Sequence, residues 1–151
     1  FGSSPFYHFE DHTMSFFKVE TQNSFLDLVD ENGEQMEITV ELRPTSSKEV
    51  QRAERAGNAE LMEAMRKGKQ TAAIMQDIND RKLAAHIAGW KASENPRTTD
   101  ADGREIPIPV PEYSEANALA MIQDKDFPYV RRQIDEFVGK ASNFYRRSDP
   151  A

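Results

Sequence analysis

Hydrophobic and polar residues alternate from position 36 to position 43, and this pattern predicts a half-buried β-strand. Asn32-Gly33 lies just before it and favours the type I′ turn of a β-hairpin, because both residues tolerate positive φ. Pro44 ends the strand, since proline cannot donate a ladder hydrogen bond. We therefore expect a hairpin over residues 24–43. The hydrophobic positions of its second strand are Met36, Ile38, Val40 and Leu42.

The first strand of this hairpin is less regular than the second. Phe25 and Val29 fall on one face, whereas Leu26 and Leu28 fall on the other. A strand with apolar residues on both faces is typical of a strand that is covered on both sides. We therefore expect one face to meet the core and the other, with Leu26 and Leu28, to meet a partner.

Four later stretches have the spacing of hydrophobic residues that is typical of amphipathic helices. Ser46-Ser-Lys-Glu49 is a capping-box pattern for the first, and Gly57-Asn58 is expected to kink that helix or divide it in two. Ser114 is a candidate N-cap for the third, and Pro128 suits the first turn of the fourth. The expected helices cover about residues 47–67, 71–91, 114–124 and 128–146.

Aromatic residues lie at the ends of two of these helices. Trp90, the only tryptophan, ends the second helix and is expected to be buried. Phe144 and Tyr145 form the final turn of the last helix, which has the clearest apolar stripe. Because this turn is close to the C-terminus, we expect it to project beyond the domain and to offer both rings to a partner.

Residues 92–113 have no regular periodicity and predict a long loop. Within it, the run from Ile106 to Pro111 alternates proline with aliphatic residues and should be extended, near polyproline II. Two interpretations remain open. The run is a stiff strap over the core, or it is a docking strip that presents Ile106, Ile108 and Val110 to a partner.

These elements predict the α+β class: a mostly helical single domain with one antiparallel β-hairpin packed on three or four helices. Residues 14–151 are expected to form this domain, and residues 1–13 are interpreted as a foreign or extra N-terminal segment. The side chains expected to be buried are Met36, Ile38, Val40, Ile74, Ile78, Leu83, Ile87, Trp90, Leu119, Ile134, Phe137 and Val138.

Composition narrows the class of partner. The chain has 151 residues, 38% hydrophobic and 30% charged, with a net charge of −7 and no cysteine. A net negative charge repels a phosphate backbone, and every apolar run is too short to span a bilayer, so neither nucleic acid nor a membrane is an expected partner. The lack of cysteine excludes disulfides and thiolate metal sites.

Charge is unevenly distributed along the chain, and this suggests self-association. Residues 15–42 hold seven acidic residues and one lysine, whereas residues 48–69 hold six basic and four acidic residues. The acidic hairpin, through Glu37 and Glu41, could meet the basic helix of a neighbouring copy. Such a contact joins two different surfaces, so it would give a ring or a helical oligomer.

The sequence lacks the motifs of catalytic and metal sites. When Gly103 of Asp100-Ala-Asp-Gly103 is placed at position six of a calcium loop, Pro109 falls at position twelve, where a glutamate is needed. His86 stands alone in a helical stretch, and no nucleophile lies beside a recognisable base. We therefore expect a protein that is not an enzyme and that needs no cofactor.

Three places in the chain, in this order, resemble the small tail assembly chaperones of long-tailed bacteriophages. The first is the acidic hairpin whose last strand ends in Arg43-Pro-Thr45 before a helix. The second is a helix that runs into a tryptophan, Ile87-Ala-Gly-Trp90, followed by Asp102-Gly103 and the polar helix start Tyr113-Ser-Glu-Ala-Asn117. The third is the terminal amphipathic helix from Val130 to Tyr145. The loop with alternating prolines departs from the family pattern.

The resemblance implies a virion-assembly factor that binds the tape measure protein, keeps it soluble and promotes polymerisation of the tail tube. It implies a location in the host cytoplasm and absence from the mature virion. It also implies a second, longer product of programmed frameshifting that contacts the tail tube protein. The rival interpretations are a structural tail-completion or head–tail connector protein, and a regulator that binds a protein partner through the hairpin.

Overall fold

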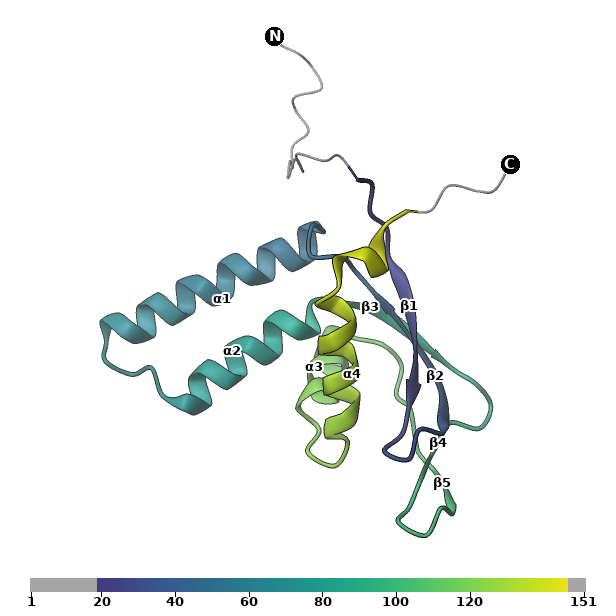
Figure 1. The fold of residues 1–151 in the computed structure, drawn as a ribbon. Coiled ribbons are helices and arrows are strands. Elements are labelled where there is room, and N and C mark those ends of the chain that lie inside the picture. Colours follow the sequence, from purple (N-terminus) through teal and green to yellow (C-terminus); the bar gives the residue numbers. More distant parts are fainter. Residues whose placement is uncertain (1–18, 147–151) are drawn as a thin grey trace.

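The structure, a computed structural model that describes residues 19–146, has an α+β fold in which helix predominates over strand (Figure 1). This confirms the predicted fold class. The expectation for residues 1–13 lies outside the described residues. The elements in chain order are β1 (Ser24–Val29), β2 (Gln35–Leu42), α1 (Lys48–Arg66), α2 (Ala72–Ala84), β3 (Ile87–Ala92), β4 (Arg97–Thr99), β5 (Glu105–Pro107), α3 (Glu115–Gln123), α4 (Pro128–Val138) and a 3-10 helix (Ala141–Phe144).

A three-stranded antiparallel sheet in the order β1-β2-β3 supports the core. Directly opposed residues share a face of such a sheet, so Leu26, Val40 and Trp90 lie on one face. The core is on this face, where the buried side chains of β2 contact apolar residues of α3 and α4, and Figure 1 shows both helices on one side of the sheet. The opposite face carries Phe25 opposite Glu41.

The third strand corrects the prediction of a helix through residue 91. The second helix ends at Ala84, and residues 87–92 pair with β2 instead. Arg43 stabilises this exit, because its Nη1 donates to the carbonyls of Ala85 (2.8 Å) and Ile87 (3.0 Å). The spacing of Ile87 and Trp90 suits a helix, but pairing with the exposed edge of β2 satisfies the backbone and keeps both residues on the core.

The turn between β1 and β2 also differs from its prediction. Gly33 has φ 83° and Asn32 does not have positive φ, so the turn is not type I′. The carboxylate of Asp30 is the physical reason, because its Oδ1 accepts from the amides of Asn32 and Glu34, both at 2.9 Å. These bonds favour a turn in which the Gly33 amide donates to the Asp30 carbonyl at 3.0 Å.

The region predicted as a long loop contains a short second hairpin, formed by β4 and β5. Its turn repeats the same chemistry: Oδ1 of Asp100 accepts from the amides of Asp102 and Arg104, and Gly103 has φ 80°. Ile106 is therefore part of β5, opposite Thr98, rather than of a polyproline segment. Residues 108–113, after β5, form an irregular strap.

The last helix ends earlier than predicted. Helix α4 stops at Val138, and the following 3-10 helix turns Phe144 back into the core, where its ring meets that of Phe137 edge-on at 5.5 Å. The Phe144 carbonyl accepts from the amide of Gln22 at 2.8 Å, which ties the two ends of the described chain together. The expectation that this turn projects beyond the domain is wrong, because a backbone partner and an apolar site are available to it.

Helices α1 and α2 form an arm that extends away from the sheet (Figure 1). Helix α1 is continuous, so the expected kink or break at Gly57 is wrong. Gly57 is buried where α1 crosses α2, and a Cβ there would lie 3.1 Å from a methyl carbon of Ile78. The N-cap of α1 is Ser47, one residue after the start of the predicted capping box, and Ser114 caps α3 as predicted.

Most of the predicted core is confirmed. The side chains that are fully buried as expected are Met36, Ile38, Val40, Ile78, Leu83, Ile87 and Ile134. The others are half-buried rather than buried: Ile74, Trp90, Leu119, Phe137 and Val138. Within residues 19–146, no helix combines the length and the apolar character that a bilayer span requires.

Candidate functional site

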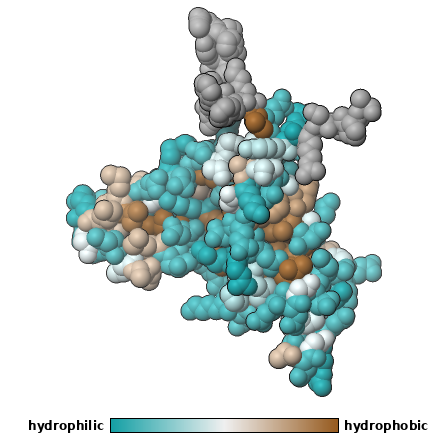
Figure 2. Space-filling model, in the orientation of Figure 1, coloured by the Kyte–Doolittle hydropathy of each residue, from teal (hydrophilic) through white to brown (hydrophobic). Residues whose placement is uncertain are grey.

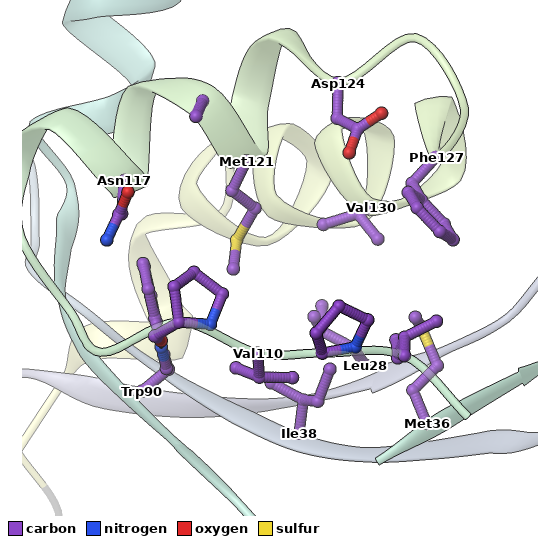
Figure 3. A pocket seen from close by; sticks show the side chains of 14 residues that line it. Leu28, Met36, Ile38, Trp90, Val110, Asn117, Met121, Asp124, Phe127 and Val130 are labelled. Atoms are coloured by element: carbon purple, nitrogen blue, oxygen red, sulfur yellow. The ribbon is translucent and has the colours of Figure 1, made fainter.

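An apolar pocket opens between the core face of the sheet, the strap and helix α3 (Figure 3). Its volume is about 180 Å³. Residues from four separate parts of the chain line it, so tertiary folding alone creates it. The lining residues are Leu28, Met36, Ile38, Trp90, Ile108, Pro109, Val110, Pro111, Asn117, Ala120, Met121, Asp124, Phe127 and Val130.

The floor of the pocket comes from the sheet. Leu28, Met36 and Ile38 are buried, and they point to the same side because strand residues alternate between faces. Figure 3 shows these side chains below the pocket and Val130 and Phe127 of the α4 region above it. The floor is therefore apolar, and a ligand that enters must offer an apolar group.

The strap forms one wall and is held in place at several points. The Ile108 amide donates to the Pro96 carbonyl at 3.1 Å, and Nε1 of Trp90 donates to the Pro111 carbonyl at 2.8 Å. The hydroxyl of Tyr113 donates to the Ile87 carbonyl at 3.1 Å, and its ring meets Trp90 edge-on at 5.2 Å. Together with the fixed φ of its prolines, these contacts fix the position of the wall.

The mouth of the pocket is formed by exposed residues of the strap, α3 and the C-cap of α3, namely Pro109, Pro111, Ala120 and Asp124. Figure 3 shows the Asp124 carboxylate directed toward the pocket. Its Oδ1 accepts from the amide of Asp126 at 2.9 Å. Within residues 19–146, the structure records no donor to its Oδ2. The mouth therefore combines apolar surface with a negative charge.

The proline run has features of both a strap and a docking strip. Ile108 and Val110 are half-buried against the core, as a strap requires, and they also line the pocket. Ile106 does not line it and is 41% exposed on the second hairpin. The structure thus brings two of the three predicted docking residues together and separates the third.

A second candidate surface lies near the end of the arm. Met62 and Met65 of α1 and Met75 of α2 are exposed, Met62 to 70%. Figure 2 shows hydrophobic side chains along the arm between hydrophilic ones. Sequence reasoning missed this surface because Met62 and Met65 fit the apolar spacing of a buried helix face. The available signal was the strongly polar surroundings of these methionines, which leave little apolar surface to cover them.

The other predicted partner residues are divided by the structure. Phe144 is 1% exposed and Tyr145 43% exposed, so only the tyrosine is available at the surface. Leu28 is buried and Leu26 packs against the core, so the expectation that these two leucines face a partner is wrong. The reason is that their face of the strand is the core face.

The open face of the sheet instead presents Phe25, which is 62% exposed. Near it, Oε2 of Glu41 accepts from Nδ2 of Asn23 at 2.9 Å. Glu37 lies 3.6 Å from Nη1 of Arg97 and has positive φ (64°). Both glutamates therefore remain at the surface, although each already has a partner within the chain.

The buried titratable groups have structural partners. Burial opposes ionisation of Asp30, but hydrogen bonds from Thr99, Glu34 and Asn32 outweigh it and lower its pKa below the usual value. Burial lowers the pKa of His86, whose Nδ1 lies 3.2 Å from the Lys82 carbonyl. Within residues 19–146, no group of three potential metal ligands comes together. What the geometry offers is the binding of apolar groups.

Comparisons with family models, with curated proteins and with solved structures find no match to this chain.

Proposed function

We propose that this protein is a tail assembly chaperone of a long-tailed bacteriophage, which binds the tape measure protein and keeps it soluble until the tail tube polymerises around it. In this proposal it is not an enzyme, acts in the host cytoplasm and is absent from the mature virion. A longer frameshift product would carry the contact to the tail tube protein. The order of the sequence motifs supports the family, with two departures: residues 87–90 belong to a strand rather than to a helix end, and the terminal helix ends at Val138. The exposed methionines of the arm support the activity.

The arm is the observation that carries the proposal. A chaperone must hold apolar segments of varied sequence, and methionine suits this because its side chain is flexible and polarizable. Met62, Met65 and Met75 expose such side chains on an element that extends away from the core. Acidic and basic residues surround them, for example Glu63, which pairs with Arg66 at 2.7 Å. Charged surroundings would keep the protein soluble while the methionines remain free to bind.

Co-expression with the tape measure protein of the same phage tests the proposal. We expect the wild-type protein to move an otherwise insoluble tape measure protein into the soluble fraction. The triple variant Met62→Ser, Met65→Ser, Met75→Ser should lose most of this effect. The stability of the variant itself should change little, because a substitution at an exposed position generally changes the free energy of unfolding by no more than about 0.5 kcal/mol.

The matched control replaces three other exposed residues of the arm region, Arg55→Ser, Ala59→Ser and Gln70→Ser. It should retain the effect. Equal rescue by both triple variants would contradict the role of the arm. Detection of this protein in purified phage particles distinguishes the rival class. A tail-completion or connector protein remains in the mature virion, and a chaperone does not.

Self-association is part of the proposal, with a different apolar contact from the one predicted from the sequence. Phe25, rather than Leu26 and Leu28, would meet a neighbouring copy beside the acidic Glu41. Sedimentation of the wild type should show oligomers that grow with concentration, and Phe25→Ser should reduce them. A wild type that stays monomeric at high concentration would exclude this contact.

A further inference from the structure

We propose that the pocket between the strap and α3 binds one large apolar side chain of a partner protein segment, and that Asp124 selects a segment with lysine or arginine beside that side chain. The inference depends on the proposed function only for the identity of the partner as the tape measure protein. The size of the pocket, its fixed walls and its charge support the binding of a basic segment whatever the partner is.

The volume of the pocket favours a side chain over a cofactor. Pockets for drug-sized ligands and cofactors generally measure about 300–1,000 Å³, whereas a cavity of about 150 Å³ holds benzene. At about 180 Å³, this pocket matches one phenylalanine, leucine or methionine side chain. A partner would present such a side chain as part of a protein segment.

The walls make the pocket ready to bind. Here the strap is tied to Pro96 at one end and to Trp90 at the other. Binding therefore does not have to order the wall, and this lowers its entropic cost. The exposed prolines at the mouth add apolar contact area at little conformational cost.

Charge at the mouth gives the preference for a basic neighbour. Asp124 is exposed beside the pocket, and within the described residues its Oδ2 accepts no recorded hydrogen bond. Glu112 and Asp126 lie next to lining residues in the chain, and Lys125 is the base beside Asp124. Of the other bases next to lining residues, Arg131 is paired with Asp80, and Lys91 lies on the opposite face of the sheet, across from Thr39. A cation next to the inserted side chain would face this acidic mouth. An acidic segment would be repelled there.

Two blocked tripeptides serve as probes, acetyl-Lys-Phe-Lys-amide and acetyl-Glu-Phe-Glu-amide. Each is titrated into the purified full chain while the fluorescence of Trp90 and its indole N–H resonance are recorded. Trp90 lines the pocket and is the only tryptophan, so both signals report on it directly. We expect the basic peptide to bind and the acidic peptide to bind at least several-fold more weakly.

Two pairs of variants test separately the apolar pocket and the charge at its mouth. Ala120→Phe should fill the pocket and abolish the response, whereas Ala116→Phe, on an exposed position of the same helix outside the lining, should retain it. Asp124→Asn keeps the acceptor for the Asp126 amide and should weaken binding of the basic peptide about two- to fivefold, as an exposed ion pair allows. Asp135→Asn, an exposed position on α4, is its charge control.

Several results would overturn the inference. One is equal binding of the two peptides, and another is unchanged peptide binding by Ala120→Phe. A third is that Ala120→Phe loses the oligomers that the wild type and Ala116→Phe form, because the occupant would then be a second copy of this protein. Ala120→Leu replaces Ala120→Phe if that variant does not fold. The titration needs only this protein and the peptides, so a negative result would contradict the pocket inference. The proposed function would instead be contradicted if the wild-type protein did not make the tape measure protein soluble.

Discussion

Replacing Phe144 with alanine is expected to lower the free energy of unfolding by about 3–5 kcal/mol, the range for a phenylalanine removed from a core. The ring is 1% exposed and meets Phe137 edge-on at 5.5 Å. Its loss would leave a cavity beneath the 3-10 helix, where the chain ends pair through the Gln22 amide and the Phe144 carbonyl. The variant should also expose the segment around residues 20–22 to proteases, because that pairing depends on the packed turn.

Urea unfolding measures this change, and Tyr145→Ala is the matched control. Tyr145 is the next residue but is 43% exposed, so its variant should lose far less stability. The difference in lost unfolding free energy between the two variants is a sharper test than either value by itself. If Tyr145→Ala costs as much as Phe144→Ala, the C-terminal turn does not bury the phenylalanine in solution, and the projecting turn expected from the sequence would be correct instead.

The second large effect is expected at Arg131, which pairs with the buried Asp80. The side chain of Asp80 is 7% exposed, and its Oδ1 accepts from Nη2 of Arg131 at 2.9 Å. Removing one member of a buried pair generally costs about 3–5 kcal/mol, because the other charge is left without compensation. We expect the loss of stability in Arg131→Leu to lie near the lower end of this range, since Gln76 and Gln123 still donate hydrogen bonds to Asp80.

Thermal and urea unfolding of Arg131→Leu should be compared with Arg132→Leu, which alters an exposed arginine of the same helix. The control should change stability by no more than about 0.5 kcal/mol. The double variant Asp80→Leu, Arg131→Leu removes both charges and should recover part of the loss. If the double variant loses more unfolding free energy than the two single variants lose together, the ion pair is not the source of the effect.

Asp80 is also the point at which the arm is joined to the rest of the domain. It belongs to α2, whereas Gln123 is in α3 and Arg131 in α4. Arm position therefore depends on this polar cluster as well as on apolar contacts. In Arg131→Leu we expect hydrogen exchange to rise first in α2, before the sheet is affected.

Local signals in the sequence were sufficient for several elements. The strict alternation of β2 places Met36, Ile38 and Val40 in the core, as predicted, because a strand with one polar face has only one way to bury its apolar face. Ser114 and Pro128 mark the starts of α3 and α4 for equally local reasons, a side-chain acceptor for a free amide and a preset φ. In each case the interaction lies within a few residues of the signal.

Other features depend on residues far apart in the chain, and for these the sequence pattern was ambiguous. Residues 87–92 have helical spacing but form a strand, because the edge of β2 supplies their hydrogen-bond partners. Phe144 fits an exposed terminal turn as well as a buried one, and only the site beside Phe137 decides between them. The pocket has no local signal, since its floor, strap and mouth meet only after folding.

The sequence by itself therefore determined the α+β class, the face of β2 that is buried and the starts of α3 and α4, because hydrophobic period and capping act over one or two turns. The tertiary structure alone decided which apolar residues remain available to a partner. Leu28 and Phe144 became core, while Phe25 and Met62 stayed exposed. The physical reason is that exposure depends on which other elements cover a side chain, and hydrophobicity along the chain does not specify those elements.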